Sequence, residues 1–499
     1  MSATNAIQQG KSSGKAEKKW IWMLLATVAM IIVLLLPTPA GLAVAGQRAL
    51  AVLVFAVILW MSEAVSYPVS AALVLALATL LLGLAPSLDD PHKILGTKES
   101  LDMALSGFSN SAVALVAGAL FLAAAMQVTG LDKRIALVIL SKVGSSTRGI
   151  LFGAIMVAVV LSFLVPSTTA RVGAIVPIIL GMVAAFGLEK NSRFAALIMI
   201  ASAQAASIWN IGVKTAAAQN MVAIGFMEKA FHTSVTWGEW FLYAAPWAIV
   251  MSVVLYFVML KVIPPEMKNI PNGQQMVQEQ LKALGKLTGA ETRLLIISLV
   301  LLFLWATEKV VHPLDSTTTM IIAVAVMLTP KIGVFTWSQV EKYIPWGTII
   351  LFAVGISLGT ILLKTKAATW LANAFFSSMG LDTMPILAII AILALFNIVI
   401  HLGFASATSL ASTLIPIVIA LVQGLDRPDM NLVGMVLIQQ FVVSFGFILP
   451  VNAPQNMVAF GTGTFTTKDF IKSGIPLTVI GYLLLLLFAA TYWKWMGLL

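Results

Sequence analysis

The chain has 499 residues, of which 60% are hydrophobic and only 10% charged, against about 25% charged residues in an ordinary soluble domain. This composition excludes a water-soluble globule and predicts an all-α polytopic membrane protein. The 30 Lys and Arg against 20 Asp and Glu give a formal net charge of +10. The basic residues are scattered between apolar blocks, which excludes a nucleic-acid-binding face.

The residue types present also exclude most redox and metal chemistry. The sequence contains no cysteine, which removes disulfides, Cys-ligated zinc and iron–sulfur clusters. Its four histidines, His92, His232, His312 and His401, lack the close spacing that a protein-bound transition metal needs. We therefore expect neither a cofactor nor a metal site.

The first apolar run, residues 20–36, follows a tail with four lysines at residues 1–19. A signal peptide is the alternative, because residues 41–46 offer a small-residue cleavage site. The run is longer than a usual signal-peptide core, and lysines in front of a first span favour retention. We expect a helix whose N-terminus lies in the cytoplasm.

Further apolar runs form two groups of similar size. The first group comprises residues 48–64, 68–85, 111–128, 149–187, 194–226 and 240–262. A polar interval at 264–293 follows, and its basic residues place it in the cytoplasm. The second group comprises residues 294–307, 317–333, 346–378, 384–424, 431–462 and 474–492. These runs predict about 11 transmembrane helices.

Four of the runs are interrupted near their middle by Ser, Thr, Pro, Gly or Asn. Three of them, 149–187, 194–226 and 384–424, are too long for one span of about 20 residues. The run 431–462 is interrupted by Pro450-Val451-Asn452-Ala453-Pro454. A broken apolar segment needs protein or a water-filled cavity around its freed backbone. We expect two re-entrant hairpins and two broken helices. Interrupted segments at corresponding positions of two halves indicate the substrate-binding site of a carrier.

Two motifs recur along the chain in the same order. The segments Ser167-Thr168-Thr169 and Ser406-Ala407-Thr408 lie 239 positions apart, and Pro-Ile follows each at the same distance. The sequence Gln-Asn-Met-Val-Ala occurs at 219–223 and again at 455–459, 236 positions later. Matching motifs at nearly one offset indicate an internal duplication. The expected form is an inverted repeat if the linker closes an odd number of passes.

The charges inside the broken segments are all positive or can become so. They are Arg171, Lys214 and His401, and no Asp or Glu shares their segments. An ionisable residue at membrane depth costs several kcal/mol and usually serves a pathway, a relay or a ligand. We therefore expect the counter-ion to be an anion that binds and leaves. The alternatives are snorkelling or a backbone cap for the two cations, and a neutral hydrogen-bonded imidazole for His401.

Groups that hold a carboxylate surround these cations. Hydroxyls and amides donate to anionic oxygens, helix N-termini at the breaks favour anions, and proline stops helix propagation where the backbone opens. The predicted substrate-binding residues are Ser167, Thr168, Thr169, Arg171, Lys214, Asn220, His401, Ser406, Thr408, Asn452, Pro454 and Asn456.

The segment Gly355-Ile356-Ser357-Leu358-Gly359 fits the G-x-S-x-G elbow of hydrolases. That elbow needs a strand-to-helix turn, whereas this segment lies in an apolar helical run. Small residues that let helices pack closely explain it better. We expect no enzyme; a membrane-embedded hydrolase using Ser357 and an anion channel are the alternatives from other classes.

Four segments of the chain carry a resemblance to a known family: 166–171, 404–408, 447–461 and Pro345-Trp346-Gly347-Thr348. Through them the sequence resembles the divalent anion/sodium symporter family over about residues 20–495. The resemblance implies a homodimer in the bacterial cytoplasmic membrane, with a scaffold part and a transport part that moves as an elevator. It implies substrates such as succinate, malate, 2-oxoglutarate, tartrate or citrate. It also implies carboxylate contacts from Ser167, Thr169, Ser406 and Thr408, with Asn220 and Asn456 nearby.

The sequence departs from the sodium-coupled members of that family. Their tips usually read Ser-Asn-Thr, whereas Thr168 and Ala407 occupy the central positions here; Ala407 completes the predicted site. Lys214 occupies the first unwound loop, and a fixed ammonium close to a sodium site repels the ion. We therefore expect exchange of two carboxylate anions, with sodium-coupled dicarboxylate symport as the alternative.

The expected organisation has six parts. They are a cytoplasmic tail at 1–19, scaffold helices at 20–103, a first inverted repeat at 104–262, a cytoplasmic linker at 263–293, scaffold helices at 294–340 and a second inverted repeat at 341–495. The two hairpins are expected around 149–187 and 384–424. The expected partners are small carboxylate anions, the lipid bilayer and a second copy of the chain.

Overall fold

The computed structural model describes residues 3–269, 273–376 and 379–499, and the regular elements of these ranges are all helices. Ten of these helices are long and apolar enough to cross a membrane, and five further apolar helices are shorter. The predicted all-α polytopic membrane fold is confirmed. Residues 1–2 of the predicted tail and 270–272 of the predicted linker lie outside the described residues.

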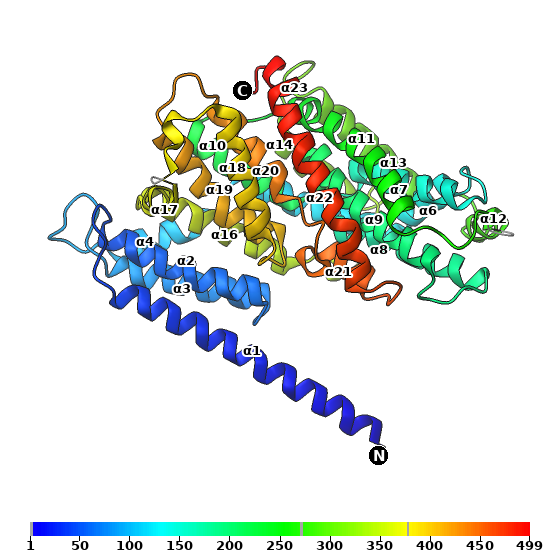
Figure 1. The fold of residues 1–499 in the computed structure, drawn as a ribbon, viewed down its shortest axis with the longest axis horizontal. Coiled ribbons are helices and arrows are strands. Elements are labelled where there is room, and N and C mark those ends of the chain that lie inside the picture. The colour runs from blue at the N-terminus through cyan, green and yellow to red at the C-terminus, as the bar shows by residue number, and fades with distance from the viewer. Residues whose placement is uncertain (1–2, 270–272, 377–378) are drawn as a thin grey trace.

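The N-terminal helices form a layer of their own at one side of the molecule (Figure 1). They are α1 (Ala3–Leu35), α2 (Val44–Ser62), α3 (Tyr67–Gly83) and α4 (Thr97–Leu105). Their buried apolar side chains form a hydrophobic cluster that is joined by residues of 351–368, and α1 projects beyond the rest of the chain. Because α1 begins at Ala3, the predicted tail is continuous with the first apolar helix.

The order of elements after α4 occurs twice. The first series comprises α5 (Ser111–Thr129), α6 (Leu131–Leu140), α7 (Thr147–Leu164), α8 (Thr168–Ala185), α9 (Arg193–Gly212), η1 (Lys214–Ala216), α10 (Ala218–Phe231) and α11 (Trp237–Val262). The second comprises α16 (Trp346–Lys364), α17 (Ala367–Phe376), α18 (Ile386–His401), α19 (Ala407–Gly424), α20 (Leu432–Val443), η5 (Pro450–Asn452), α21 (Pro454–Phe460) and α22 (Thr467–Ala490). The duplication inferred from two motifs therefore extends over eight elements in the same order, with the short helix η4 (Leu381–Thr383) added in the second series.

Helices between the two series, one short helix within the second series and one helix after it complete the described chain. They are α12 (Gly273–Ala283), α13 (Gly289–Ala306), α14 (Ser316–Leu328), α15 (Trp337–Val340), η2 (Glu341–Tyr343), η4 (Leu381–Thr383) and α23 (Tyr492–Trp495). A buried ion pair of 2.6 Å joins Arg134 of α6 to Glu291 of α13. Arg134 also donates to the carbonyl of Gly285 over 2.9 Å, so the linker is fixed to the first series.

The four predicted interruptions are present. Helical structure breaks between α7 and α8, between α9 and α10, between α18 and α19, and between α20 and α21. We call residues 166–171 the first tip and residues 404–408 the second tip. The breaks allow two re-entrant hairpins, and their re-entrant course through a membrane stays a prediction, as does the inverted form of the repeat.

The run 346–378 differs from its prediction as an uninterrupted segment. It divides into α16 and α17, because Lys366 adopts a left-handed backbone with φ of 57°. Gly130, with φ of 74°, separates α5 from α6 at the equivalent place. The short amphipathic helix α6 was likewise absent from the predicted runs. Each series thus has a second turning point that hydropathy alone does not reveal.

Large apolar side chains cover the outside of the helices that flank the core. Phe257, Phe303, Ile321 and Leu483 are all more than half exposed. Such a surface is unfavourable in water and suits a lipid bilayer.

Candidate functional site

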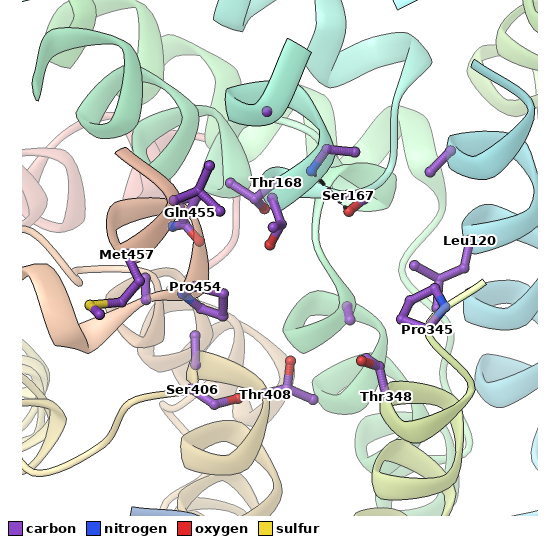
Figure 2. Close-up of a pocket in the computed structure, with 18 of the residues that line it drawn as sticks. Leu120, Ser167, Thr168, Pro345, Thr348, Ser406, Thr408, Pro454, Gln455 and Met457 are labelled. Atoms are coloured by element: carbon purple, nitrogen blue, oxygen red, sulfur yellow. Dashed lines mark hydrogen bonds between the residues drawn. The ribbon is translucent and has the colours of Figure 1, made fainter. Parts of the chain in front are cut away.

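The two tips meet at one central cavity of about 1130 Å³ (Figure 2). Its wall includes Ser167, Thr168 and Thr169 of the first tip and Ser406, Ala407 and Thr408 of the second. His401 and Pro454 also line it. Duplicated segments that are 239 positions apart in the sequence therefore face a shared space.

Ser167 and Ser406 have the same structural role in their tips. Each is the N-cap of the following helix, with φ and ψ of −142° and 111° at Ser167 and −139° and 118° at Ser406. Each Oγ accepts from a backbone N–H three residues on, over 3.3 Å. The first N–H groups of a helix have no partner within the helix, and together with the helix dipole they favour an anion. Two such helix N-termini face the cavity.

The hydroxyls of the first tip differ in what they can donate. Thr168 donates its hydroxyl hydrogen to Asn210 Oδ1 over 2.7 Å and accepts from Arg171 over 3.2 Å. Its hydrogen is therefore already used. Among the described residues no acceptor takes the hydroxyl hydrogen of Ser167 or Thr169, so these two groups are free to donate to a bound anion.

Arg171 lies behind the first tip and is 1% exposed. Its Nη2 donates to Thr168, to Asn210 and, over 3.5 Å, to the carbonyl of Ala206. Its Nε and Nη1 are enclosed and have no partner, and no ion pair of the described residues includes it. The guanidinium does not line the cavity itself, but both side chains that it contacts do. Its charge therefore acts on the cavity through Thr168 and Asn210.

Lys214 is not brought to the cavity. It is 3% exposed, and its ammonium donates over 2.7 Å to the carbonyl of Val235 at the start of α11. No carboxylate lies within ion-pair distance of Lys214 among the described residues, but Glu308, Glu228 and Glu239 are in its electrostatic surroundings, together with Lys309. The sequence suggested no acidic partner because these carboxylates lie outside its own segment. They are supplied by the fold, so the substrate contact expected of Lys214 has no counterpart in this geometry.

His401 and Asn452 hold the second tip together. His401 lines the cavity, and its Nε2 lies 3.3 Å from the carbonyl of Asn452. Because a carbonyl only accepts, Nε2 is the donor in this contact, and Nδ1 has no hydrogen-bond partner among the described residues. The amide of Asn452 donates to the carbonyls of His401 over 2.8 Å and Phe404 over 3.1 Å. Asn452 does not line the cavity and acts here as a brace of the tip.

Asn220 and Asn456 make equivalent bonds in the two halves. Asn220 Nδ2 donates to the carbonyl of Asn210 over 2.7 Å, and Asn456 Nδ2 donates to the carbonyl of Gly446 over 2.8 Å. Both pairs span ten residues across a break, and neither asparagine lines the cavity. Their side-chain amides donate to backbone carbonyls at the breaks and are therefore not available to a substrate.

Several cavity residues were not among the predicted ones. They are Gln219 and Gln455, Asn210, the pair Glu63 and Tyr67, and the pair Asp132 and Lys133. The repeated Gln-Asn-Met-Val-Ala contained the signal for the two glutamines, whereas only the fold brings in the others. Tyr67 lies 3.3 Å from Glu63 Oε1 and also interacts with Ser406. Burial raises the pKa of Asp132, on the short helix α6, to about 6.

Ser357 lies in the middle of α16 and is 1% exposed. Its Oγ accepts from the backbone N–H of Gly107 over 2.9 Å. A Cβ added at Gly355 would collide with Ser412, and one at Gly359 would collide with Phe226. The G-x-S-x-G segment is thus a close helix-packing surface, as expected, and not a nucleophile elbow.

Spanning helices around a cavity that contains hydroxyl and amide groups, with two duplicated helix N-termini at its wall, define a membrane transport protein. Residues 17–499 match the family described as the sodium:sulfate symporter transmembrane region, and the chain belongs to this family. It is a family of membrane transporters and not of enzymes. The resemblance to divalent anion/sodium symporters is confirmed.

Three relatives and one solved structure show how far the similarity extends. The chain is 52% identical to a membrane protein of Cupriavidus necator, over 95% of this chain and 93% of that one. It is 28% identical to the L-tartrate/succinate antiporter of Escherichia coli, over 97% and 99% of the two chains. It is 26% identical to the sodium-dependent dicarboxylate transporter SdcS of Staphylococcus saprophyticus, over 94% and 90%. The YdaH transporter of Alcanivorax borkumensis, at 14% identity, covers 85% of this chain and 97% of its own with a TM-score of 0.52, which shows a shared fold alone.

Proposed function

We propose that this protein exchanges one di- or tricarboxylate anion for another across the bacterial cytoplasmic membrane. The observation that carries the proposal is the pair of helix N-termini at Ser167 and Ser406, which face one cavity from the two halves. Two separated anion sites suit a substrate with an acidic group at each end. The similarity to an antiporter of tartrate and succinate supports the same substrate class.

The buried charge behind the first tip favours exchange over sodium-coupled symport. Neither Arg171 nor Lys214 forms an ion pair among the described residues, but only Lys214 has carboxylates, Glu308, Glu228 and Glu239, in its electrostatic surroundings. Moving an empty site with an unpaired guanidinium through the bilayer is costly, and a bound anion removes most of that cost. The loaded carrier then crosses readily and the empty one does not. A sodium symporter is the alternative, supported by the similarity to SdcS.

The substrate site that we propose is smaller than the set predicted from the sequence. Its direct contacts are Ser167, Thr169, Ser406, Thr408 and the free N–H groups of the two tips, with Thr168, Ala407, His401 and Pro454 completing the wall. Arg171 contributes its charge from behind. Lys214, Asn220, Asn452 and Asn456 hold the surrounding backbone in place.

The movement that we propose is an elevator in a homodimer, with the N-terminus in the cytoplasm. The scaffold of each protomer is formed by residues 20–103 and 294–340, and the moving part by the two repeats, 104–262 and 341–495. The N-terminal helices pack into a hydrophobic cluster distinct from the main core, and residues 351–368 of the second repeat join that cluster. In this proposal the boundary between the scaffold and the moving part runs through the contact of α16 with α3.

Uptake of labelled succinate into proteoliposomes tests the exchange. Vesicles preloaded with succinate should take up label without sodium, and empty vesicles should take up little under any sodium gradient. Sodium-driven uptake into empty vesicles would contradict exchange and favour symport. Current without any internal anion would indicate a channel.

A further inference from the structure

We propose that Gln455 recognises a hydroxyl group on the carbon chain of the substrate, and that the protein prefers hydroxydicarboxylates to plain dicarboxylates. This inference rests on the proposed carboxylate transport and names a subclass of its substrates. Gln455 lies at the first turn of α21, beside Pro454 and across from Thr168 at the cavity wall (Figure 2). It is the second copy of the glutamine in the repeated motif, and Gln219 is the first.

The orientation of the Gln455 amide is fixed by a hydroxyl of the other half. Gln455 Nε2 lies 3.0 Å from Ser207 Oγ, in the middle of α9. Ser207 already donates its own hydrogen to the carbonyl of Ala203 over 3.0 Å. Since its hydrogen is used, Ser207 Oγ is the acceptor in the contact with Gln455, and Nε2 is the donor. The nitrogen of the amide therefore faces α9.

The amide oxygen is left for the cavity. No hydrogen bond of the described residues ends at Gln455 Oε1, and this oxygen is not among the unpaired polar atoms that the protein encloses completely. The residue as a whole is 5% exposed and lines the cavity. Gln455 thus presents an oriented acceptor oxygen to the cavity, close to the donating groups of the first tip.

An acceptor oxygen at this position distinguishes substrates that carry a hydroxyl group from substrates that carry only carboxylates. A carboxylate oxygen is itself only an acceptor and gains nothing from Gln455 Oε1, whereas an alcohol hydroxyl donates to it. A site that holds a buried group for a substrate hydroxyl disfavours the analogue without that hydroxyl. Succinate would leave Oε1 unpaired, while malate or tartrate would satisfy it. Both classes of acid would still place their carboxylates at the two tips.

Gln219 provides an internal comparison. Its Nε2 lies 3.2 Å from Ser444 Oγ, so each glutamine reaches a serine of the opposite half. Within the described residues, however, Ser444 Oγ has no second bond that fixes which group donates. The Gln219 amide is therefore free to turn either its oxygen or its nitrogen to the cavity, and Gln455 alone has a fixed polarity.

The experiment measures the dissociation constants of succinate and malate with the purified full-length protein. The wild type should bind malate more tightly, and Gln455→Met, which keeps the length of the side chain and removes the acceptor, should reduce the malate-to-succinate preference about fivefold. Ser207→Ala, which releases the amide, should reduce it in the same direction by less. Gln275→Met makes the same chemical change on the surface helix α12 and should leave the preference as it is.

The outcomes separate this inference from the proposed function. If wild type binds both acids equally, or if Gln455→Met and Ser207→Ala both keep the preference, the recognition of the hydroxyl is wrong while carboxylate transport stands. If the wild type binds neither acid, the proposed function itself is wrong. Should Gln455→Met fail to fold, as judged by its elution and thermal midpoint, Ser207→Ala decides the question.

Discussion

Arg171 and Lys214 look alike in the sequence and are opposites in the structure. Both are buried cations in broken apolar segments. Lys214 has a carbonyl at 2.7 Å and three carboxylates in its electrostatic surroundings. Arg171 has two unpaired nitrogens and a contact with the cavity wall. The Lys214 charge therefore has acidic groups in its surroundings, whereas the Arg171 charge lies behind the cavity wall with no carboxylate paired to it among the described residues.

Replacing each cation by methionine should separate these two roles. Lys214→Met should lower the free energy of unfolding by about 1.5–3 kcal/mol, because Val235 loses a charged donor and the carboxylates lose their cation. Arg171→Met removes a charge that is expensive to bury, so its thermal midpoint should equal or exceed that of wild type. It should lose the stabilisation that succinate gives. An Arg171→Met protein that is destabilised yet still protected by succinate would contradict the division of roles.

Ser167 caps α8 and also lines the proposed anion site, and one substitution can change the second role while keeping the first. Aspartate caps a helix as well as serine does, so Ser167→Asp should keep the free energy of unfolding within about 0.5 kcal/mol of wild type. Its carboxylate would face the bound anion, and affinity for succinate should fall at least about 100-fold. Ser167→Gly, which removes the hydroxyl without adding charge, should lose at most about tenfold. Equal binding by the two variants would show that the first tip does not hold an anion.

At the breaks of the broken helices, asparagine side chains replace some of the backbone hydrogen bonds of a continuous helix. Where α9 and α20 end, carbonyls that a continuous helix would satisfy accept from Asn220 and Asn456 instead. Asn220 also accepts from Gln440 of the other half over 3.2 Å. An unwound segment inside a membrane persists only if such partners exist. These amides therefore set the shape of the cavity without lining it.

Alanine at these two positions should weaken the protein in parallel. We expect Asn220→Ala and Asn456→Ala each to lower the free energy of unfolding by about 1–3 kcal/mol, with the larger loss at Asn220, which makes more bonds. Hydrogen exchange should rise at 213–217 and 444–453 respectively. Asn373→Ala, on an exposed position of α17, is the matched control and should change neither quantity. A cost at only one of the two asparagines would mean that the halves are not energetically equivalent.

At the scale of the molecule, hydropathy and two repeated motifs were enough to predict the fold class, the duplication and all four breaks. They were enough because breaks within apolar runs are costly and leave a visible mark in composition. The turn between α16 and α17 was missed because it adds no polar stretch, only the left-handed Lys366. The partners of Lys214 were missed because Glu308 is 94 positions away in the sequence and is brought close by packing alone.

The predicted site residues also divide into those that the sequence placed correctly at the cavity and those that have another partner in the structure. The tips were predicted because their hydroxyls repeat, and those hydroxyls do meet at one cavity. Asn220, Asn452 and Asn456 were placed among the ligands because an amide in an apolar run suggests a polar guest. The structure shows that backbone carbonyls of the breaks take those amides first. The sequence indicates that a polar side chain in an apolar run needs a hydrogen-bond partner. The identity of that partner follows only from the three-dimensional structure.

The bonds between the two halves have a consequence for the origin and engineering of the chain. Gln219 reaches Ser444, Gln455 reaches Ser207, and Gln204 donates to the carbonyl of Phe447 over 2.9 Å. Polar side chains of each half thus have hydrogen-bond partners that the other half supplies. This arrangement is what two identical subunits of an ancestral dimer would show after fusion into one chain. We expect the two halves, divided between α11 and α12 and produced as separate polypeptides in one cell, to associate through these contacts.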